Sequence, residues 1–274
     1  MMKKFFAGLM LACVALTASA FRTDTIQVPT KFLESAEDVV VITPEAGLKG
    51  EACPTVYILN GFSGNHTSWL GTQPRLGELA DQYGMVLVMP DGRDSWYWDS
   101  PVDPKMQMES FFIKDLVPYI DNNYPTIREA AQRAITGLSM GGHGSLWLAT
   151  RHPEVFGSMG SMSGGVNILP FPKSWRMADR LGAYADNKEV WESHTVISLV
   201  PQMAANGQNI IFDCGVDDFF AEVNNDLHKR LVEAKVRHDY TSRPGAHTHK
   251  YWANSIYYHL LFFDHEFKQI NKNR

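Results

Sequence analysis

The sequence predicts an α/β protein with a mostly parallel central sheet and helices on both faces. Short apolar runs of strand length alternate with stretches of helical spacing, and several runs are continuously apolar, such as Thr55–Leu59 (TVYIL) and Met85–Met89 (MVLVM). Strands that are apolar on both faces are typical of parallel sheets buried between helices. A chain that alternates strand and helix forms βαβ units with right-handed crossovers. With 45% hydrophobic residues, the chain can bury a sizeable core, which excludes a disordered protein.

The individual elements follow from the same patterns. Strands are expected at Asp38–Thr43, Thr55–Leu59, Met85–Met89, Arg133–Thr136, Phe156–Met162, Asn209–Asp213 and His238–Ser242. Helical spacing covers Gln107–Tyr119, Gly144–Arg151, Phe219–Ala234 and Lys250–Phe267. In the last of these, one apolar face recurs every three or four residues and would pack on the sheet. Its members are Trp252, Ile256, Leu260, Phe263 and Phe267.

The stretch 165–205 interrupts the alternation of strands and helices. It contains three prolines and several aromatic residues, including Trp175 and Trp191, but no strong strand pattern. We interpret it as an insertion over one end of the sheet, at the edge where a site would lie. No Pro- or Ser-rich linker divides the remaining chain, so residues 21–274 are expected to form a single domain.

The first twenty residues have the pattern of a cleavable export signal. Lys3 and Lys4 precede an apolar run that extends to Thr17, and Ala18-Ser19-Ala20 supplies the small residues that a signal peptidase requires. The run is too short to span a bilayer comfortably. Cys13 lies in a weak lipoprotein-like motif, MLAC, but apolar residues continue beyond it. We therefore predict an exported protein, periplasmic or secreted, with a lipoprotein anchored at Cys13 as the minor alternative.

Charge and cysteine content narrow the possible partners. Removal of residues 1–20 leaves 254 residues and changes the net charge from −5 to −7, because Lys3 and Lys4 are lost. Nucleic-acid binding needs a basic face, so it is not expected, and no stable membrane span should remain after cleavage. Cys53 and Cys214 each lie beside or within a strand-like run, which favours two separate buried thiols over a disulfide. The sequence predicts no oligomeric state.

A serine on a tight turn is the strongest chemical signal. The segment Gly137-Leu138-Ser139-Met140-Gly141 has the form G-x-S-x-G and lies between the strand run Arg133–Thr136 and a helical stretch. The two glycines let strand and helix approach closely, and the serine hydroxyl then projects above the carboxyl ends of the strands. The N-terminus of the following helix favours developing negative charge. Ser139 is therefore the predicted nucleophile.

A serine hydroxyl also needs a base and a carboxylate that orients the base. Proteins with this turn supply them in the order serine, acid, histidine, from loops after later strands. Asp217 and Asp218 follow the run Asn209–Asp213, and His247 follows His238–Ser242, so the order fits. The residues alone leave either aspartate as the acid. His247 and His249 could form half of a metal site, but no partner motif is evident, so neither a metal nor a cofactor is predicted.

A serine that attacks a carbonyl group also requires two N–H donors for the oxyanion of the transition state. One should be the backbone N–H of Met140, which follows the nucleophile. The other should come from the loop after Thr55–Leu59, where Gly61 and Gly64 permit a close fold, and the N–H of Phe62 is our candidate. His143 is expected to line the start of the helix or the wall of the site.

With these motifs in order, nearly the whole chain after residue 20 resembles the esterase D-like branch of the α/β-hydrolases. That branch includes tributyrin esterases, S-formylglutathione hydrolases, and feruloyl and acetylxylan esterases. The matching segments include Met89-Pro90-Asp91-Gly92, Ser95-Trp96-Tyr97, Gly137–Gly142 and Gly245-x-His247-x-x-x-Tyr251-Trp252. The resemblance implies an α/β-hydrolase fold with Ser139 as nucleophile, His247 as base and Asp218 as acid. The chain departs from the pattern at Asn60, where relatives often have His, and at His249, where they often have Trp.

Aromatic residues on the predicted loops suggest how a substrate could bind. Trp96, Tyr97, Trp98 and Trp175, with His249, are tentative substrate-contacting residues that could stack on a sugar or feruloyl ring. Packing in the core or in a lid is the alternative.

Together these features predict an exported serine carboxylesterase acting on acetyl or feruloyl esters of plant polysaccharides or oligosaccharides. The alternatives are an S-formylglutathione hydrolase-like or short-chain acyl esterase, an acyltransferase, and an inactive carbohydrate-binding relative.

Overall fold

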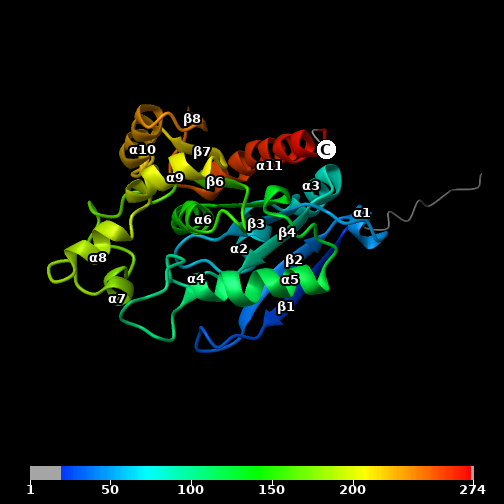
Figure 1. Cartoon of the computed structure of the whole chain (residues 1–274), viewed down its shortest axis with the longest axis horizontal. Coiled ribbons are helices and arrows are strands. Elements are labelled where there is room, and N and C mark those ends of the chain that lie inside the picture. The colour runs from blue at the N-terminus through cyan, green and yellow to red at the C-terminus, as the bar shows by residue number, and fades with distance from the viewer. Residues whose placement is uncertain (1–19, 273–274) are drawn as a thin grey trace, which may run out of the picture.

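A computed structural model describes residues 20–272 and contains one eight-stranded sheet in that range. The strand order is β1-β2-β4-β3-β5-β6-β7-β8, and the sheet runs through the middle of the molecule (Figure 1). The predicted export signal, except for Ala20, lies outside the described residues, as does Cys13. The strands are β1 Arg22–Val28, β2 Glu37–Thr43, β3 Thr55–Leu59, β4 Val86–Pro90, β5 Arg133–Gly137, β6 Ser158–Met162, β7 Asn209–Gly215 and β8 Asp239–Arg243.

The predicted mostly parallel sheet is confirmed. Strands β4, β3, β5, β6, β7 and β8 pair in parallel, whereas β1 pairs antiparallel with β2 and β2 antiparallel with β4. Seven strands lie within two residues of the predicted runs. Strand β1 was not predicted, because its sequence RTDTIQV lies at a half-exposed edge, alternates polar and apolar residues and is not an apolar run.

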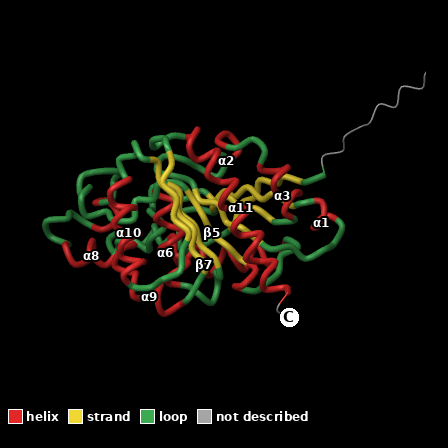
Figure 2. Tube along the Cα trace, turned by 90° about the horizontal axis from the view of Figure 1, so that it is seen from above, coloured by secondary structure: helices red, strands yellow, loops and turns green. Residues whose placement is uncertain are grey.

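Helices cover both faces of this sheet. They are α1 Glu45–Leu48, α2 Ser68–Thr72, α3 Leu76–Tyr83, α4 Met108–Phe111, α5 Val117–Asn123, α6 Met140–Arg151, α7 Ala178–Leu181, α8 Lys188–Ser193, α9 Val200–Asn206, α10 Ala221–Glu233 and α11 His249–Lys272. A π-helical turn, Phe112–Leu116, joins α4 to α5, and short 3₁₀ turns lie at Ala130–Gln132 and Val196–Leu199. Figure 2 shows α2, α3 and α11 on one side of the strands and α6, α9 and α10 on the other.

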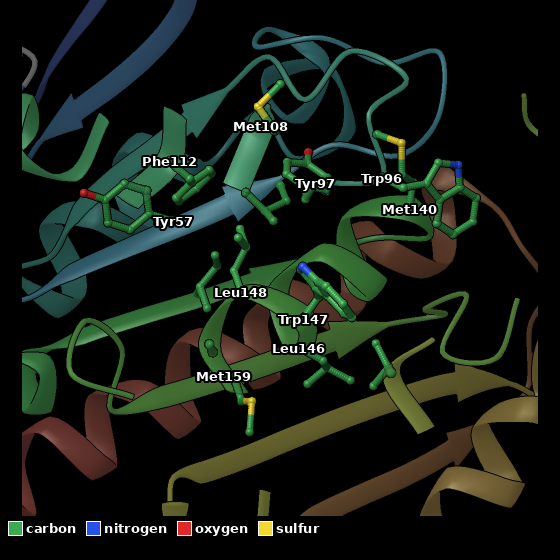
Figure 3. Close-up of a cluster of buried hydrophobic side chains, with 14 of the residues drawn as sticks. Tyr57, Trp96, Tyr97, Met108, Phe112, Met140, Leu146, Trp147, Leu148 and Met159 are labelled. Atoms are coloured by element: carbon green, nitrogen blue, oxygen red, sulfur yellow. The ribbon is translucent and has the colours of Figure 1, made fainter. Parts of the chain in front are cut away.

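The core is divided by the sheet into two apolar clusters, because successive strand residues point to opposite faces. Val39 and Val41 of β2 belong to the larger cluster, and Val40 and Ile42 belong to the smaller one. Figure 3 shows part of the larger cluster, where side chains of β3, α4 and α6 converge. The smaller cluster includes the predicted apolar face of α11, whose five side chains are all buried. Each buried side chain of that size stabilises the fold by roughly 1.5–3 kcal/mol.

The stretch 165–205 contains no strand in the described structure, as expected for an insertion. It carries α7, α8 and the first part of α9, and it extends beyond the sheet at the left of Figure 1. None of these helices was predicted from the sequence, and neither were α1, α2 and α3. Most have only four to seven residues, too few to establish a helical period.

Candidate active site

Ser139 lies on the turn between β5 and α6 in a strained backbone conformation. Its φ is 57° and its ψ is −116°, a region that L-residues rarely adopt. The flanking glycines make this turn possible. A Cβ on Gly141 would lie 2.5 Å from the carbonyl oxygen of Leu59, and one on Gly137 would lie 2.6 Å from the backbone of Gly141. Strand β3, strand β5 and helix α6 therefore meet at a distance that only glycine permits.

The three residues singled out from the sequence come together at the carboxyl edge of the sheet. The Oγ of Ser139 lies 2.9 Å from Nε2 of His247. Nδ1 of the same ring lies 2.9 and 3.0 Å from the two carboxylate oxygens of Asp218. The imidazole is thus held between a hydroxyl and a carboxylate, each on a different loop.

Asp218, and not Asp217, makes these contacts. The Asp218 side chain is fully buried, and its Oδ1 also accepts a hydrogen bond of 2.8 Å from the backbone N–H of Phe220. Asp217 is exposed, and its N–H donates to the carbonyl of Gly245, which ties the loop after β7 to the loop that carries His247. The turn geometry therefore points one carboxylate inward and leaves the other in solvent.

The loop after β3 lies against Ser139. A Cβ on Gly61 would be 3.3 Å from Cβ of Ser139. In the described part of the chain, neither the N–H of Phe62 nor the N–H of Met140 is paired with an acceptor. Met140 opens helix α6, where N–H groups have no partner within the helix. Both predicted oxyanion donors are therefore free and belong to segments that touch the serine.

Asn60 locks this loop in place. Its side-chain amide donates to the carbonyl of Gly61, and its Oδ1 accepts from the N–H of Gly92 at 2.9 Å. The hydroxyl of Tyr97 lies 3.1 Å from both the Oδ1 and the backbone carbonyl of Asn60. The residue at which this chain departs from the resembled family thus has a structural role in holding the loop.

A cavity of about 420 Å³ opens above the serine. Trp175 and His249, two of the tentative substrate-contacting residues, line it. Nδ1 of His249 lies 2.7 Å from the Thr72 hydroxyl, which orients this ring. The cavity is also lined by two aromatic residues that sequence reasoning did not assign to the site, Phe219 and Trp252.

The other three tentative substrate contacts were predicted wrongly. The side chains of Trp96, Tyr97 and Trp98 are at most 1% exposed and pack inside the larger cluster, where Figure 3 shows Trp96 and Tyr97. Positive φ angles of 56° at Trp96 and 64° at Tyr97 turn the backbone so that these rings enter the core. Trp96 then stacks on Trp98 at 5.6 Å. The alternative of core packing was the correct one.

Trp98 also holds His143 in its neutral form. The indole N–H donates to Nε2 of His143 at 2.9 Å, and Nδ1 of that ring lies 3.0 Å from the carbonyl of Gly165. An Nε2 that accepts and an Nδ1–H that donates define one neutral tautomer. Burial lowers the pKa of His143 to about 3. Because His143 is fully buried and does not line the cavity above Ser139, it lies behind the start of α6.

Phe219 and Trp252 were missed for different reasons. The ring of Phe219 is 4.2 Å from that of His247 and is 52% exposed, but its position directly after the acid was the only available signal. Trp252 meets His247 edge-on at 4.8 Å. Its helical spacing predicted that it packs on the sheet, and it does belong to the smaller apolar cluster. Because it lies near the start of α11, it also lines the cavity above Ser139.

Other groups in the described residues bear on the remaining expectations. Cys53 and Cys214 are free and buried, which confirms two separate thiols, and burial raises the pKa of both. Within residues 20–272, no set of three or more His, Cys, Asp or Glu side chains is arranged to hold a metal ion. Among the helices described there, none has the length and apolar character needed to cross a bilayer.

The mostly parallel sheet with helices on both faces, and the serine turn between β5 and α6, match the α/β-hydrolase fold. Comparison with known proteins agrees: the chain belongs to the Esterase family, whose model matches residues 31–263. It is therefore a carboxylic-ester hydrolase.

Individual relatives are distant. An acetyl esterase of Caldicellulosiruptor saccharolyticus is 23% identical over 250 residues, covering 83% of this chain and 92% of that protein. An S-formylglutathione hydrolase of Paracoccus denitrificans is 25% identical over 62% of this chain and 66% of its own length. A solved ferulic acid esterase is 25% identical and superposes with a TM-score of 0.78, covering 90% of this chain and 98% of that one.

Proposed function

We propose that this protein is an exported serine esterase that hydrolyses acetyl or feruloyl esters of plant polysaccharides or oligosaccharides. The observation that carries the mechanism is the contact of the His247 ring with Ser139 on one side and Asp218 on the other. Export is supported by the residue pattern of positions 1–20. The substrate class is supported by the similarity to an acetyl esterase and to a ferulic acid esterase.

In the first step, His247 takes the proton of Ser139 and Oγ attacks the carbonyl carbon of the ester. The carbonyl oxygen develops a negative charge and accepts hydrogen bonds from the N–H groups of Phe62 and Met140. Asp218 keeps the proton of the neutral ring on Nδ1 and stabilises the imidazolium that forms. The ester C–O bond then breaks, His247 gives its proton to the leaving alcohol, and the acyl group stays on Ser139.

In the second step, a water molecule replaces the alcohol. His247 takes a proton from the water, the resulting hydroxide attacks the acyl carbonyl, and the same two N–H groups hold the second oxyanion. The serine leaves with the proton from His247, which restores the enzyme and releases the acid. No step in this sequence needs a cofactor.

Replacement of the nucleophile tests the mechanism. The Ser139→Ala variant should lose at least about 10³-fold in kcat for 4-nitrophenyl acetate while remaining folded. Ser193→Ala, on the exposed side of α8, is a matched control and should retain wild-type activity. Turnover by Ser139→Ala at the wild-type rate would overturn the proposal.

S-acylated glutathione is the second candidate substrate, favoured by the similarity to an S-formylglutathione hydrolase. The comparison of kcat/KM for S-formylglutathione with that for acetylated xylo-oligosaccharides separates the two. A higher kcat/KM for S-formylglutathione would make S-acylated glutathione, and not a polysaccharide ester, the proposed substrate. Product analysis with a competing sugar acceptor distinguishes hydrolysis from acyl transfer in the same experiment.

A further inference from the structure

Within residues 20–272, three aromatic rings contact the imidazole of His247. The ring of Phe219 lies closest, with 4.2 Å between centroids, whereas Trp252 and Phe220 meet the imidazole edge-on at 4.8 and 5.5 Å. Trp252 and Phe220 are at most 5% exposed, so packing in the core fixes their positions. Phe219 is half exposed. The ring closest to the proposed base is therefore the one that the core holds least.

The insertion contacts Phe219 through Trp175. The two rings stack, with 5.7 Å between centroids and 21° between ring planes. The ring of Trp175 also lies 5.2 Å from that of Phe220. Aromatic pairs at such distances attract each other beyond the effect of the area that they bury. A stack of rings thus leads from the insertion through Phe219 to His247.

Trp175 reaches this position through a strained backbone. Its φ is 48° and that of Arg176 is 53°, a left-handed conformation that costs free energy in residues other than glycine. Two such residues in succession persist only where the surrounding structure imposes the conformation. One restraint is the indole N–H of Trp96, which donates to the carbonyl oxygen of Trp175 at 3.3 Å.

Another restraint is the carboxylate of Asp94, which pairs with arginine side chains of the insertion. Its Oδ2 lies 2.8 Å from Nη1 of Arg176, and its Oδ1 lies 2.6 Å from Nη2 of Arg180 in α7. The side chains of Asp94 and Arg180 are only 17% and 9% exposed, so salt and water screen this pair less than an exposed one. Asp94 and Trp96 belong to the same loop after β4. That loop therefore holds the strained segment on both sides of the Trp175 ring.

We propose that Trp175 and Asp94 are positioning residues for the proposed base, His247. Asp94 fixes the strained segment, Trp175 supports Phe219, and Phe219 keeps the imidazole from rotating away from the nucleophile and the acid. This inference rests on the proposed function, in which the imidazole moves a proton in both steps. A small displacement of such a group lowers the rate by a large factor. The insertion thus supports the reaction itself, besides forming a wall of the cavity.

The test separates positioning of the base from contact with the substrate. Trp175→Leu and Phe219→Leu are assayed with 4-nitrophenyl acetate and 4-nitrophenyl butanoate, which share an alcohol and differ in the acyl group. Because His247 acts in both steps, kcat should fall by the same factor for the two esters, about three- to tenfold. A residue that only contacts the substrate would instead change KM, by a factor that depends on the acyl group.

Asp94→Asn provides a variant outside the cavity, because Asp94 does not line the space above Ser139. It should lower kcat for both esters by about threefold, since the ion pairs that it loses are partly shielded from water. Asp179→Asn is the matched control. Asp179 pairs with the same Arg176 at 2.7 Å but is 49% exposed and does not contact the loop after β4, so this variant should keep the wild-type kcat.

A double variant tests whether the residues act in series. Asp94→Asn added to Phe219→Leu should leave kcat at the value of Phe219→Leu alone, because the ring through which Asp94 acts is already absent. Titration of Ser139 with a fluorophosphonate counts the folded sites, so kcat is expressed per site even where a variant folds incompletely.

Three results would overturn the inference: a wild-type kcat in Trp175→Leu or Asp94→Asn, a fall in kcat confined to one ester, or effects of Asp94→Asn and Phe219→Leu that multiply. Failure of the proposed function is a different result, because Ser139→Ala itself would then keep its activity.

Discussion

Within residues 20–272, two arrays of hydroxyl, imidazole and carboxylate can be compared, and their surroundings differ. At the cavity, His247 contacts Ser139 through Nε2 and Asp218 through Nδ1. In the core, His259 contacts Thr136 through Nδ1 at 2.7 Å and Asp213 through Nε2 at 3.0 Å. The residue types and distances are nearly the same, but the two ring nitrogens have exchanged partners.

Their surroundings separate the two arrays. The His247 side chain is 16% exposed and opens to the cavity, whereas that of His259 is completely buried. The hydroxyl at the cavity is on a strained turn beside free N–H donors, whereas Thr136 is an ordinary residue of β5. A triad of residue types is therefore not a catalyst by itself. Access for a substrate and donors for the oxyanion distinguish the two.

The core array also connects the strands that carry the site. Thr136 belongs to β5 and lies three positions before Ser139, and Asp213 belongs to β7 and lies five positions before Asp218. Arg243, at the end of β8, pairs with Asp213 at 3.2 Å. Ser255 of α11 lies between them and hydrogen bonds to both. Each strand that leads into a residue of the site thus contributes one member to a buried polar cluster, which holds the strand ends in register.

The largest expected effect comes from replacing the carboxylate of each array by an amide, in separate variants. Asp218→Asn should lower kcat for 4-nitrophenyl acetate by about 10³–10⁴-fold with little change in stability, because the ring loses its orienting anion. Asp213→Asn should lower the free energy of unfolding by about 3–5 kcal/mol, because Arg243 loses its buried partner. Steady-state kinetics of both variants measures kcat, and urea unfolding of both measures the free energy of unfolding. The contrast between the arrays is wrong if Asp213→Asn keeps wild-type stability and loses as much activity as Asp218→Asn does.

His143 is a second fully buried imidazole, and it can be compared with the partly exposed His247. Burial lowers the pKa of His143 to about 3 from an ordinary value of 6.5. Between these values the unfolded chain binds more protons than the folded one, so stability is fully present above pH 6.5 and falls as the pH falls. This group alone contributes about 1.4 kcal/mol per pH unit.

The variant His143→Gln removes this titration and retains a donor toward Gly165 and an acceptor for Trp98. It should therefore lose less stability than the wild type when the pH is lowered from about 6 to about 4. Urea unfolding at several pH values measures the difference, with the exposed His265→Gln as control. If His143→Gln and the wild type lose stability in parallel, burial does not hold His143 neutral.

The smallest expected effect concerns the two hydroxyls. Thr136→Val should lower the free energy of unfolding by about 1–3 kcal/mol, because one nitrogen of the sealed His259 loses its partner. Ser139→Ala should leave stability nearly unchanged, since water can reach His247. Thermal unfolding of the two variants measures the difference. Equal losses of stability would show that exposure of the imidazole does not separate the arrays.

Much of the fold could be predicted from the sequence because its signals are local. Short runs of strand length, several of them continuously apolar, identified seven of the eight strands in the described residues. The spacing of three or four residues in α11 identified its packing face. Strand β1 was missed because it is half exposed and gains its structure from pairing with β2. The short helices of the insertion were missed because four to seven residues are too few to establish a helical period.

The candidate site could be predicted in its residue types but not in its walls. Ser139 and His247 follow from a glycine pattern and from chain order, whereas the choice between Asp217 and Asp218 depends on a turn that no periodicity describes. Trp96 and Phe219 show the same limit for aromatic residues. The first was expected at the cavity and is buried, and the second was expected to open a helix and lines the cavity.

By itself the sequence determined the order of strands and helices, the serine turn and the class of chemistry, because these depend on residue spacing and on the small size of glycine. The tertiary structure decided which carboxylate faces His247, which aromatic rings line the cavity above Ser139 and which of the two similar arrays opens to that cavity. Those outcomes depend on contacts between residues 29 and 108 positions apart. Such contacts exist only after the sheet has brought the ends of β5, β7 and β8 together.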